Sequence, residues 1–111
     1  MQEESNVRSL PTIAAAVVLL ATATPVAGQG ASNVARSLAA GCANCHGTNG
    51  VSTGEMVSLA GRPKDELARK MQDFKTGRAG GTIMPQLAKG YTDEQIDRAA
   101  AWFAAQPAPR K

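Results

Sequence analysis

Apolar residues recur at helical spacing in three stretches of the chain, whereas no stretch has the apolar and polar alternation of a β-strand. The first stretch covers about residues 32–41 and has Val34, Leu38 and Ala39 on one face. A Ser-Asn pair at its start offers N-cap side chains. The pattern predicts an all-α protein whose first helix occupies this stretch.

The second stretch begins around Pro63, a residue type favoured in the first turn of a helix. Leu67, Met71 and Phe74 form its apolar stripe at spacings of four and three. Gly77 ends the pattern, and the glycines that follow favour a non-helical connection. We therefore predict a second helix between Pro63 and Gly77.

The third stretch has the clearest start, because Thr92 is a good N-cap and Gln95 stands three residues later, as in a capping box. The predicted helix runs from Asp93 to about Ala105 and ends before two prolines. Its apolar side consists of Ile96, Ala99, Ala100 and Phe103. No internal repeat is present, so the three helices belong to one domain.

The N-terminal part of the chain resembles an export signal. Residues 13–23 are uncharged and mostly apolar, but this run is shorter than the ~20 residues of a membrane span. Small residues follow, which predicts a cleavable signal over residues 1–28, with cleavage after Ala23 as an alternative. Two acidic residues outnumber the single arginine before the apolar run, so a misplaced start or a retained anchor stays open. We expect a periplasmic domain over residues 29–111 and no membrane span after processing.

The expected mature domain is moderately basic. Residues 29–111 contain eleven of the twelve Lys and Arg residues and seven of the nine Asp and Glu residues, a net charge of +4. This charge favours acidic partner surfaces. It is too small and too dispersed for a nucleic-acid interface, so no nucleic-acid partner is expected. Lys75, Arg78 and Lys89 are candidates for steering an acidic partner, or else ordinary solvated side chains.

The motif Cys42-Ala43-Asn44-Cys45-His46 carries the chemistry of the chain. The pattern C-x-x-C-H is typical of covalent haem attachment, in which each thiol adds to one vinyl group and the histidine binds the iron. A zinc site normally needs four Cys or His ligands, and the chain has only these two Cys and one His. A thioredoxin-like pair needs a βαβ context that the sequence lacks. The sequence predicts one haem c, attached through Cys42 and Cys45.

Large apolar side chains are scarce: the chain has one Trp, one Tyr and two Phe. A domain of about 80 residues has little core to spare and often needs a staple. The two cysteines are too close in sequence to provide one as a disulfide. We therefore expect the haem to supply the missing apolar volume, and the haem-free chain to be largely unstructured.

The second axial position of the iron requires a donor other than histidine, because no second histidine exists. The mature part contains Met56, Met71 and Met84. Met71 belongs to an apolar stripe, where core packing is the ordinary role. Met56 follows His46 by only ten residues, which makes the opposite haem face awkward to reach. Met84 is expected in a loop between two helices, stiffened by the proline after it, and is the predicted ligand together with His46.

These features resemble the class I cytochromes c, in which a helix leads into C-x-x-C-H, a Met-Pro sequence occurs late and the last helix bears adjacent aromatics, here Trp102-Phe103. The resemblance implies a fold of three to four helices around one haem. It also implies that the first and last helices cross beside the haem. Val34, Leu38, Phe103 and Trp102 are assigned to that contact by this resemblance.

A closer resemblance is carried by Phe74-Lys75-Thr76-Gly77, by Thr82-Ile83-Met84 and by Leu87-Ala88-Lys89-Gly90-Tyr91. These segments are similar to the cytochrome subunits of flavocytochrome c sulfide dehydrogenases and to related cytochromes of bacterial sulfur oxidation. Val57 occupies a position where that family commonly has a proline. In the family, that proline helps to position a backbone carbonyl against the haem histidine. The single C-x-x-C-H motif indicates one haem.

The resemblance implies one-electron transfer in the periplasm without catalysis by the chain's own side chains. The expected partner is a flavoprotein (FAD) subunit that oxidises sulfide, or another redox protein. A free soluble carrier between respiratory or photosynthetic complexes is the alternative. A gas-binding or catalytic haem would require an open axial position and is the weaker third possibility.

Overall fold

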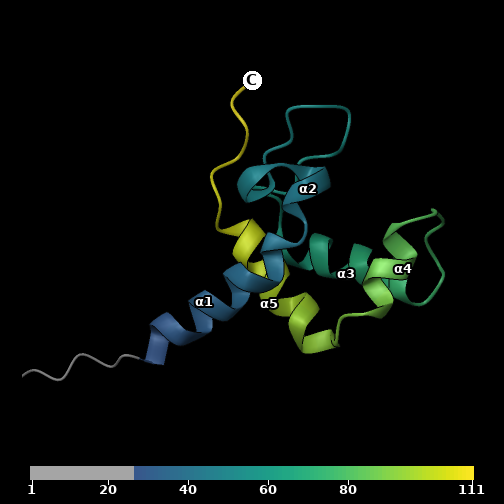
Figure 1. Ribbon diagram of the computed structural model, residues 1–111, viewed down its shortest axis with the longest axis horizontal. Helices are drawn as coiled ribbons and strands as arrows, with labels where there is room; N and C mark the ends of the chain where they lie inside the picture. Colours follow the sequence, from purple (N-terminus) through teal and green to yellow (C-terminus); the bar gives the residue numbers. More distant parts are fainter. Residues whose placement is uncertain (1–26) are drawn as a thin grey trace, which may run out of the picture.

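The computed structural model describes residues 27–111, and this part of the chain contains helices but no strands (Figure 1). In chain order the elements are α1 (Ala27–Ala40), α2 (Ala43–His46), the 3-10 turn η1 (Thr48–Gly50), α3 (Lys64–Lys75), α4 (Met84–Lys89) and α5 (Asp93–Ala104). The predicted all-α class is confirmed. The described part has five α-helices, and the expected number was three to four. Two of the five are short: α2 has four residues and α4 has six.

Helices α3 and α5 begin where the sequence predicts. Pro63 is the N-cap residue of α3, and Asp65 and Glu66 occupy its first turn, where carboxylates favour the helix dipole. At α5 the capping box is present in both directions. The Gln95 amide donates to Thr92 Oγ1 at 3.1 Å, and the Thr92 amide donates to Gln95 Oε1 at 2.9 Å. Local side-chain chemistry therefore sets the start of α5.

Helix α1 begins at Ala27, earlier than the predicted start near residue 32. Ser32 and Asn33 consequently lie inside the helix and do not cap it. In a helix interior each of these residues costs well under about 1 kcal/mol relative to alanine, and alanines lie nearby at positions 31 and 35, so the helix continues through them. The predicted export signal lies almost wholly within residues 1–26, outside the described residues.

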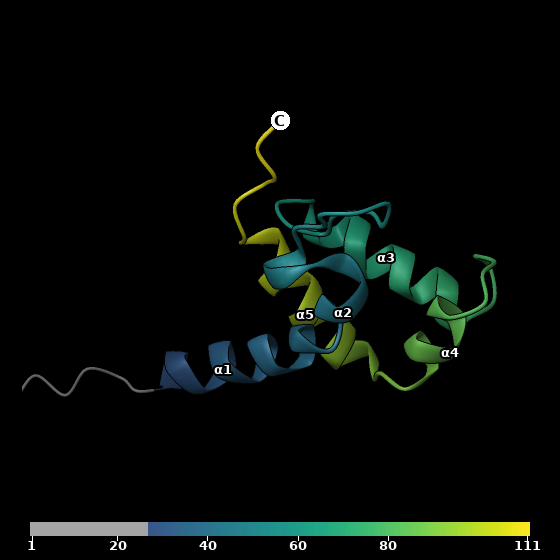
Figure 2. The same cartoon turned by 45° about the horizontal axis from the view of Figure 1, so that its top comes forward.

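The C-terminal half of α1 packs against α5, while its N-terminal half extends away from the other helices (Figures 1 and 2). Phe103 is buried in this contact, and Trp102 and Leu38 are half-buried, in line with their assignment. Val34 is 48% exposed and is not among the residues of the buried cluster or those packed against it, so its assignment to this contact stays a prediction. Ala39, five residues further along α1, supplies the buried side chain of this helix.

Helix α3 packs against both α4 and α5. Two ion pairs join α3 to α5: Lys64 Nζ lies 2.8 Å from Asp97 Oδ1, and Lys75 Nζ lies 2.9 Å from Asp93 Oδ1. The main buried cluster is small and consists of Ala39, Leu67, Ala100 and Phe103. Within residues 27–111, no helix combines the length and the apolar character needed to cross a bilayer.

Candidate functional site

A cavity of about 740 Å³ lies beside the C-x-x-C-H motif. This volume is in the range of cofactor and ligand sites. Its apolar lining comes from the segment after the motif and from helices α3, α4 and α5, and comprises Met56, Val57, Leu59, Leu67, Met71, Phe74, Ile83, Met84, Leu87, Tyr91, Ile96, Ala99, Ala100 and Phe103. Cys42, Cys45 and His46 line the same cavity. The small core therefore surrounds a large apolar space that begins at the predicted attachment site.

The motif forms one helical turn at the cavity wall. The amide of His46 donates to Cys42 O at 2.9 Å, so the two cysteines and the histidine are held within a single turn. Cys42 is half-buried, Cys45 is exposed and His46 is 7% exposed. A three-residue cysteine spacing on such a turn directs both sulfurs toward one edge of the cavity, as two thioether bonds to one porphyrin require.

The imidazole of His46 is oriented by the backbone. Its Nδ1 atom lies 2.7 Å from the carbonyl oxygen of Val57. A carbonyl oxygen can only accept, so Nδ1 carries the proton and donates. In the neutral ring, Nε2 is then the atom with a free lone pair. The resembling family commonly has a proline at this position. Here the backbone carbonyl of a valine, Val57, accepts the bond from His46.

A closed loop brings Val57 to His46. Gly50 has φ of 78°, and its carbonyl accepts the amides of Leu59 at 2.8 Å and Ala60 at 3.1 Å. In the same loop, Ser58 Oγ accepts a hydrogen bond from the Ser52 amide at 2.9 Å. The positive φ favours glycine at position 50, and an added Cβ would lie 2.7 Å from the Phe103 ring. These bonds hold the carbonyl of Val57 in place without a proline ring.

All three candidate methionines line the cavity. Met84 is half-buried and is the first residue of α4, so the expectation that it lies in a loop is wrong. Pro85 explains the difference, because its fixed φ suits the first turn of a helix as well as it suits a loop. Met71 is half-buried on α3, and Met56 is 48% exposed. The cavity therefore offers thioether sulfurs from α3, from α4 and from the segment after the motif.

Charged side chains from α3, and one from two residues before it, also border the cavity, and the sequence pattern did not single them out. They are Arg62, Glu66, Arg69, Lys70 and Asp73. Arg62 pairs with Glu66, and Asp73 pairs with Arg78. Arg69 and Lys70 make no ion pair among the described residues, although Lys70 Nζ lies 5.4 Å from the centre of the Phe74 ring, so two cations without an acidic partner there border the apolar space. Their helical spacing beside the Leu67 and Met71 stripe is the signal that could have identified them.

The three cations expected to steer an acidic partner, Lys75, Arg78 and Lys89, differ in whether they form ion pairs within the domain. Lys75 pairs with Asp93 and is 28% exposed, and Arg78 pairs with Asp73 at 2.9 Å. Lys89 is exposed in the last turn of α4. Two of the three predicted steering residues therefore serve contacts within the domain.

Two groups of the site have shifted acidities. Burial raises the pKa of the Cys42 thiol, and the charge of nearby Cys45 adds to the rise. Burial also raises the pKa of Tyr91, with a further contribution from Cys42. Both groups are therefore kept in their neutral forms in the folded chain.

The residues of the site fit a haem. The cavity is lined mainly by apolar side chains, it holds both motif cysteines, and it contains a histidine whose Nδ1 is already bonded to a carbonyl. Thioether sulfurs are available as a second soft donor. Within residues 27–111, no three or more His, Cys, Asp or Glu side chains gather as a metal site, so the cysteine pair lacks the partners of a structural zinc site there.

Three relatives are similar to this chain. The cytochrome subunit of sulfide dehydrogenase from Chlorobaculum tepidum is 39% identical over 66 residues, which are 60% of this chain and 60% of that protein. The thiosulfate dehydrogenase electron acceptor of Stutzerimonas stutzeri is 35% identical over 83 residues, 73% of this chain and 37% of that protein. Cytochrome c4 of Thiocapsa roseopersicina is 34% identical over 67 residues, 60% of this chain and 34% of that protein.

Each of these alignments covers less than two thirds of the relative's own length. The family-level match is broader, because the profile of the family described as cytochrome c oxidase, cbb3-type, subunit III matches residues 29–103. A cytochrome c domain of this kind implies covalently bound haem c, and Cys42 and Cys45 fit its attachment motif. The chain thus belongs to the cbb3-type subunit III family of cytochrome c domains and is a class I c-type cytochrome.

Proposed function

We propose that this protein is a periplasmic one-electron carrier whose haem iron is bound by His46 and Met84. The relatives that support the coarser statement, electron transport by a cytochrome c, include an electron acceptor and a cytochrome subunit by name. The observation that carries the finer proposal is the shared cavity of about 740 Å³, which contains the motif, the oriented His46 and Met84. A c-type haem held there supplies a one-electron Fe(III)/Fe(II) couple.

His46 is suited to be the first axial ligand. Its burial excludes water from the ring, and the bond from Nδ1 to the Val57 carbonyl leaves Nε2 as the donor atom. A histidine oriented in this way cannot rotate freely, so the ring stays in one position through a redox cycle. This rigidity favours fast electron transfer because little of the protein has to rearrange.

Met84 is the proposed second axial ligand among the three methionines. It is half-buried in the cavity wall, whereas Met56 is 48% exposed and lies one residue before the carbonyl that contacts His46. Met56 is therefore adjacent in sequence to Val57, whose carbonyl lies on the His46 side of the cavity. Met71 shares the α3 stripe with buried Leu67 and is suited to packing. A sulfur ligand favours Fe(II) and raises the reduction potential.

The proposed ligation has a direct test in carbon monoxide binding to the reduced protein. With the sixth position closed by a sulfur, the wild-type protein should bind carbon monoxide slowly and incompletely. Replacing Met84 by Ala should open the position and give a fast, complete reaction. Rapid carbon monoxide binding by the wild-type protein would favour the gas-binding alternative.

We also propose a flavoprotein that oxidises sulfide as the physiological electron donor. The support is the 39% identity to a cytochrome subunit of sulfide dehydrogenase. Arg69 and Lys70 border the cavity without ion-pair partners in the described part of the chain, and they are suited to hold acidic groups of a partner. Cys45 is exposed, so the attachment edge is the proposed exit for electrons.

Complex formation distinguishes this proposal from a free carrier. A stable stoichiometric complex with a flavoprotein on size-exclusion chromatography supports the subunit. A monomeric cytochrome that copurifies with no flavin supports the free carrier. Periplasmic export has its own test: N-terminal sequencing of the mature protein should begin at Gln29, and recovery of unprocessed protein from the cytoplasm would contradict export.

A further inference from the structure

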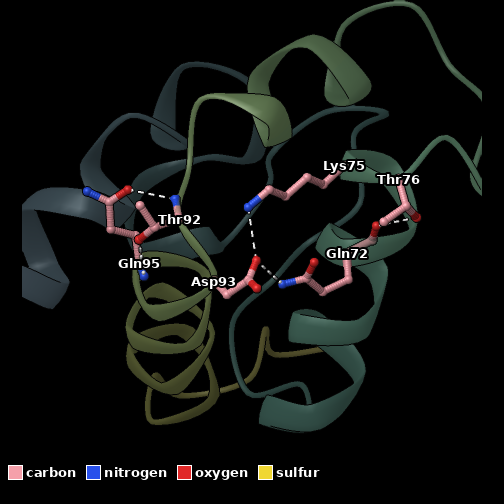
Figure 3. A network of polar contacts seen from close by, with 6 residues as sticks. All are labelled: Gln72, Lys75, Thr76, Thr92, Asp93 and Gln95. Carbon is pink, nitrogen blue, oxygen red and sulfur yellow. Dashed lines mark hydrogen bonds and ion pairs between the residues drawn. The ribbon is translucent and has the colours of Figure 1, made fainter.

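Asp93, the first residue of α5, holds together two helices that are separated by a long connection (Figure 3). Its Oδ1 atom accepts hydrogen bonds from Gln72 Nε2 and from Lys75 Nζ, each at 2.9 Å. Gln72 and Lys75 both belong to the C-terminal part of α3. We call these three residues the α3–α5 clasp.

Both sides of the clasp are anchored locally. The capping box between Thr92 and Gln95 fixes the backbone at Asp93, so its carboxylate starts from a defined position. On the other side, Thr76 Oγ1 donates to Gln72 O at 2.8 Å and closes the end of α3. Each anchor fixes the backbone from which a side chain of the clasp extends, so less backbone entropy is lost when the clasp forms.

The clasp encloses the segment that carries Met84. Lys75 and Asp93 are 18 positions apart, and residues 76–92 between them include α4. Within this segment Ala88 is buried, and Ile83 and Leu87 line the cavity together with Met84. Helix α4 packs against α3, and restraint at the two ends of the segment further limits how far Met84 can move.

We propose that Asp93 is a positioning residue for Met84, because the α3–α5 clasp fixes both ends of the ligand-bearing segment and keeps the sulfur at the iron. This inference rests on the proposed ligation by Met84. Asp93 does not itself line the cavity. Its effect is on how often the sulfur leaves the iron, and an external ligand can report that frequency.

The test is displacement of the sulfur by imidazole in the oxidised holoprotein, followed through the red sulfur-to-iron charge-transfer band. In the Asp93→Asn variant the apparent affinity for imidazole should rise about fivefold, the order expected when one exposed ion pair is lost. Asp97→Asn is the matched control. Asp97 lies one turn later on α5 and also pairs with α3, through Lys64 at 2.8 Å, but that pair does not bound the Met84 segment. Its imidazole affinity should stay within about twofold of the wild type.

Lys75→Gln provides an independent second variant should Asp93→Asn fail to retain haem. It should also raise imidazole affinity about fivefold, and the double variant should show no further rise, because both changes remove one interaction. An unchanged affinity in Asp93→Asn, or an equal rise in Asp97→Asn, would overturn the inference. A charge-transfer band that survives Met84→Leu would instead overturn the ligation itself, so the two failures are distinguishable.

Discussion

His46 Nδ1 donates a hydrogen bond of 2.7 Å to the backbone carbonyl of Val57, eleven residues further along the chain. This bond selects the ring tautomer and leaves Nε2 for the iron. It also joins the attachment turn to the loop over residues 51–58. The loop is in turn held by Ser58 Oγ, which accepts the Ser52 amide at 2.9 Å. Ser58 thus supports the histidine indirectly, through the backbone that bears the carbonyl.

Replacing Ser58 by Ala should loosen this loop and weaken the bond to His46. The loss of one hydrogen bond should lower the free energy of unfolding by about 1 kcal/mol. A less basic imidazole stabilises Fe(III) less, so the reduction potential should rise. Redox titration and urea unfolding measure the two effects. Ser52→Ala is the control, because its backbone amide still donates to Ser58; an equal rise in its potential would contradict this role for Ser58.

Gly50 is predicted to be intolerant of a side chain. Its φ is 78°, and an added Cβ would approach the Phe103 ring to 2.7 Å. Gly50→Ala combines backbone strain with overpacking and should lower the free energy of unfolding by at least about 2 kcal/mol. Gly54→Ala has open space around it and should be nearly neutral. Chemical denaturation of both holoproteins gives the comparison, and similar midpoints for the two variants would contradict it.

The haem-free polypeptide should lose much of its helicity. The buried cluster includes only four side chains, two of them alanines, whereas the adjacent cavity has a volume of about 740 Å³. A domain of this size with so small a core has little stability of its own. Circular dichroism of a Cys42→Ala/Cys45→Ala variant produced without haem tests this. Native helicity in that variant would show that the helices do not need the cofactor.

Asp93 gives the stability a defined pH dependence. Hydrogen bonding from Gln72, then hydrogen bonding and charge from Lys75, lower the pKa of Asp93 below its ordinary value of 3.8. A lowered folded-state pKa means that the stabilisation is fully present above pH 3.8 and is lost as the pH falls through the lower folded-state value. The difference in urea midpoint between wild type and Asp93→Asn should therefore be constant at neutral pH and shrink only in strong acid. A difference that already shrinks between about pH 7 and pH 5 would contradict this.

The sequence predicted those features that depend on local chemistry. Thr92 and Gln95 define the start of α5 by their own side chains, and the C-x-x-C-H motif places its cysteines within one turn. Long-range packing was harder to predict. Val34 has the same helical register as Leu38 but is 48% exposed, and register alone does not say how deeply a position on a helix is buried.

The structure also shows two relationships that sequence spacing could not supply. The clasp joins Lys75 to Asp93, and the bond from His46 reaches Val57 without the expected proline. In both cases the partners are brought together by a closed loop. Helix α4 was missed for a local reason, since six residues after a glycine pair give too short a pattern to distinguish from a turn.

The most direct measurement of the central claim is the red sulfur-to-iron charge-transfer band of the oxidised protein in the wild type and in two matched variants. Met84 and Met56 both line the cavity, so each is replaced by Leu, which has similar volume and no sulfur. An electron carrier with His46 and Met84 as ligands predicts that Met84→Leu abolishes the band and that Met56→Leu retains it. Loss of the band in Met56→Leu with its retention in Met84→Leu would contradict the proposed ligation.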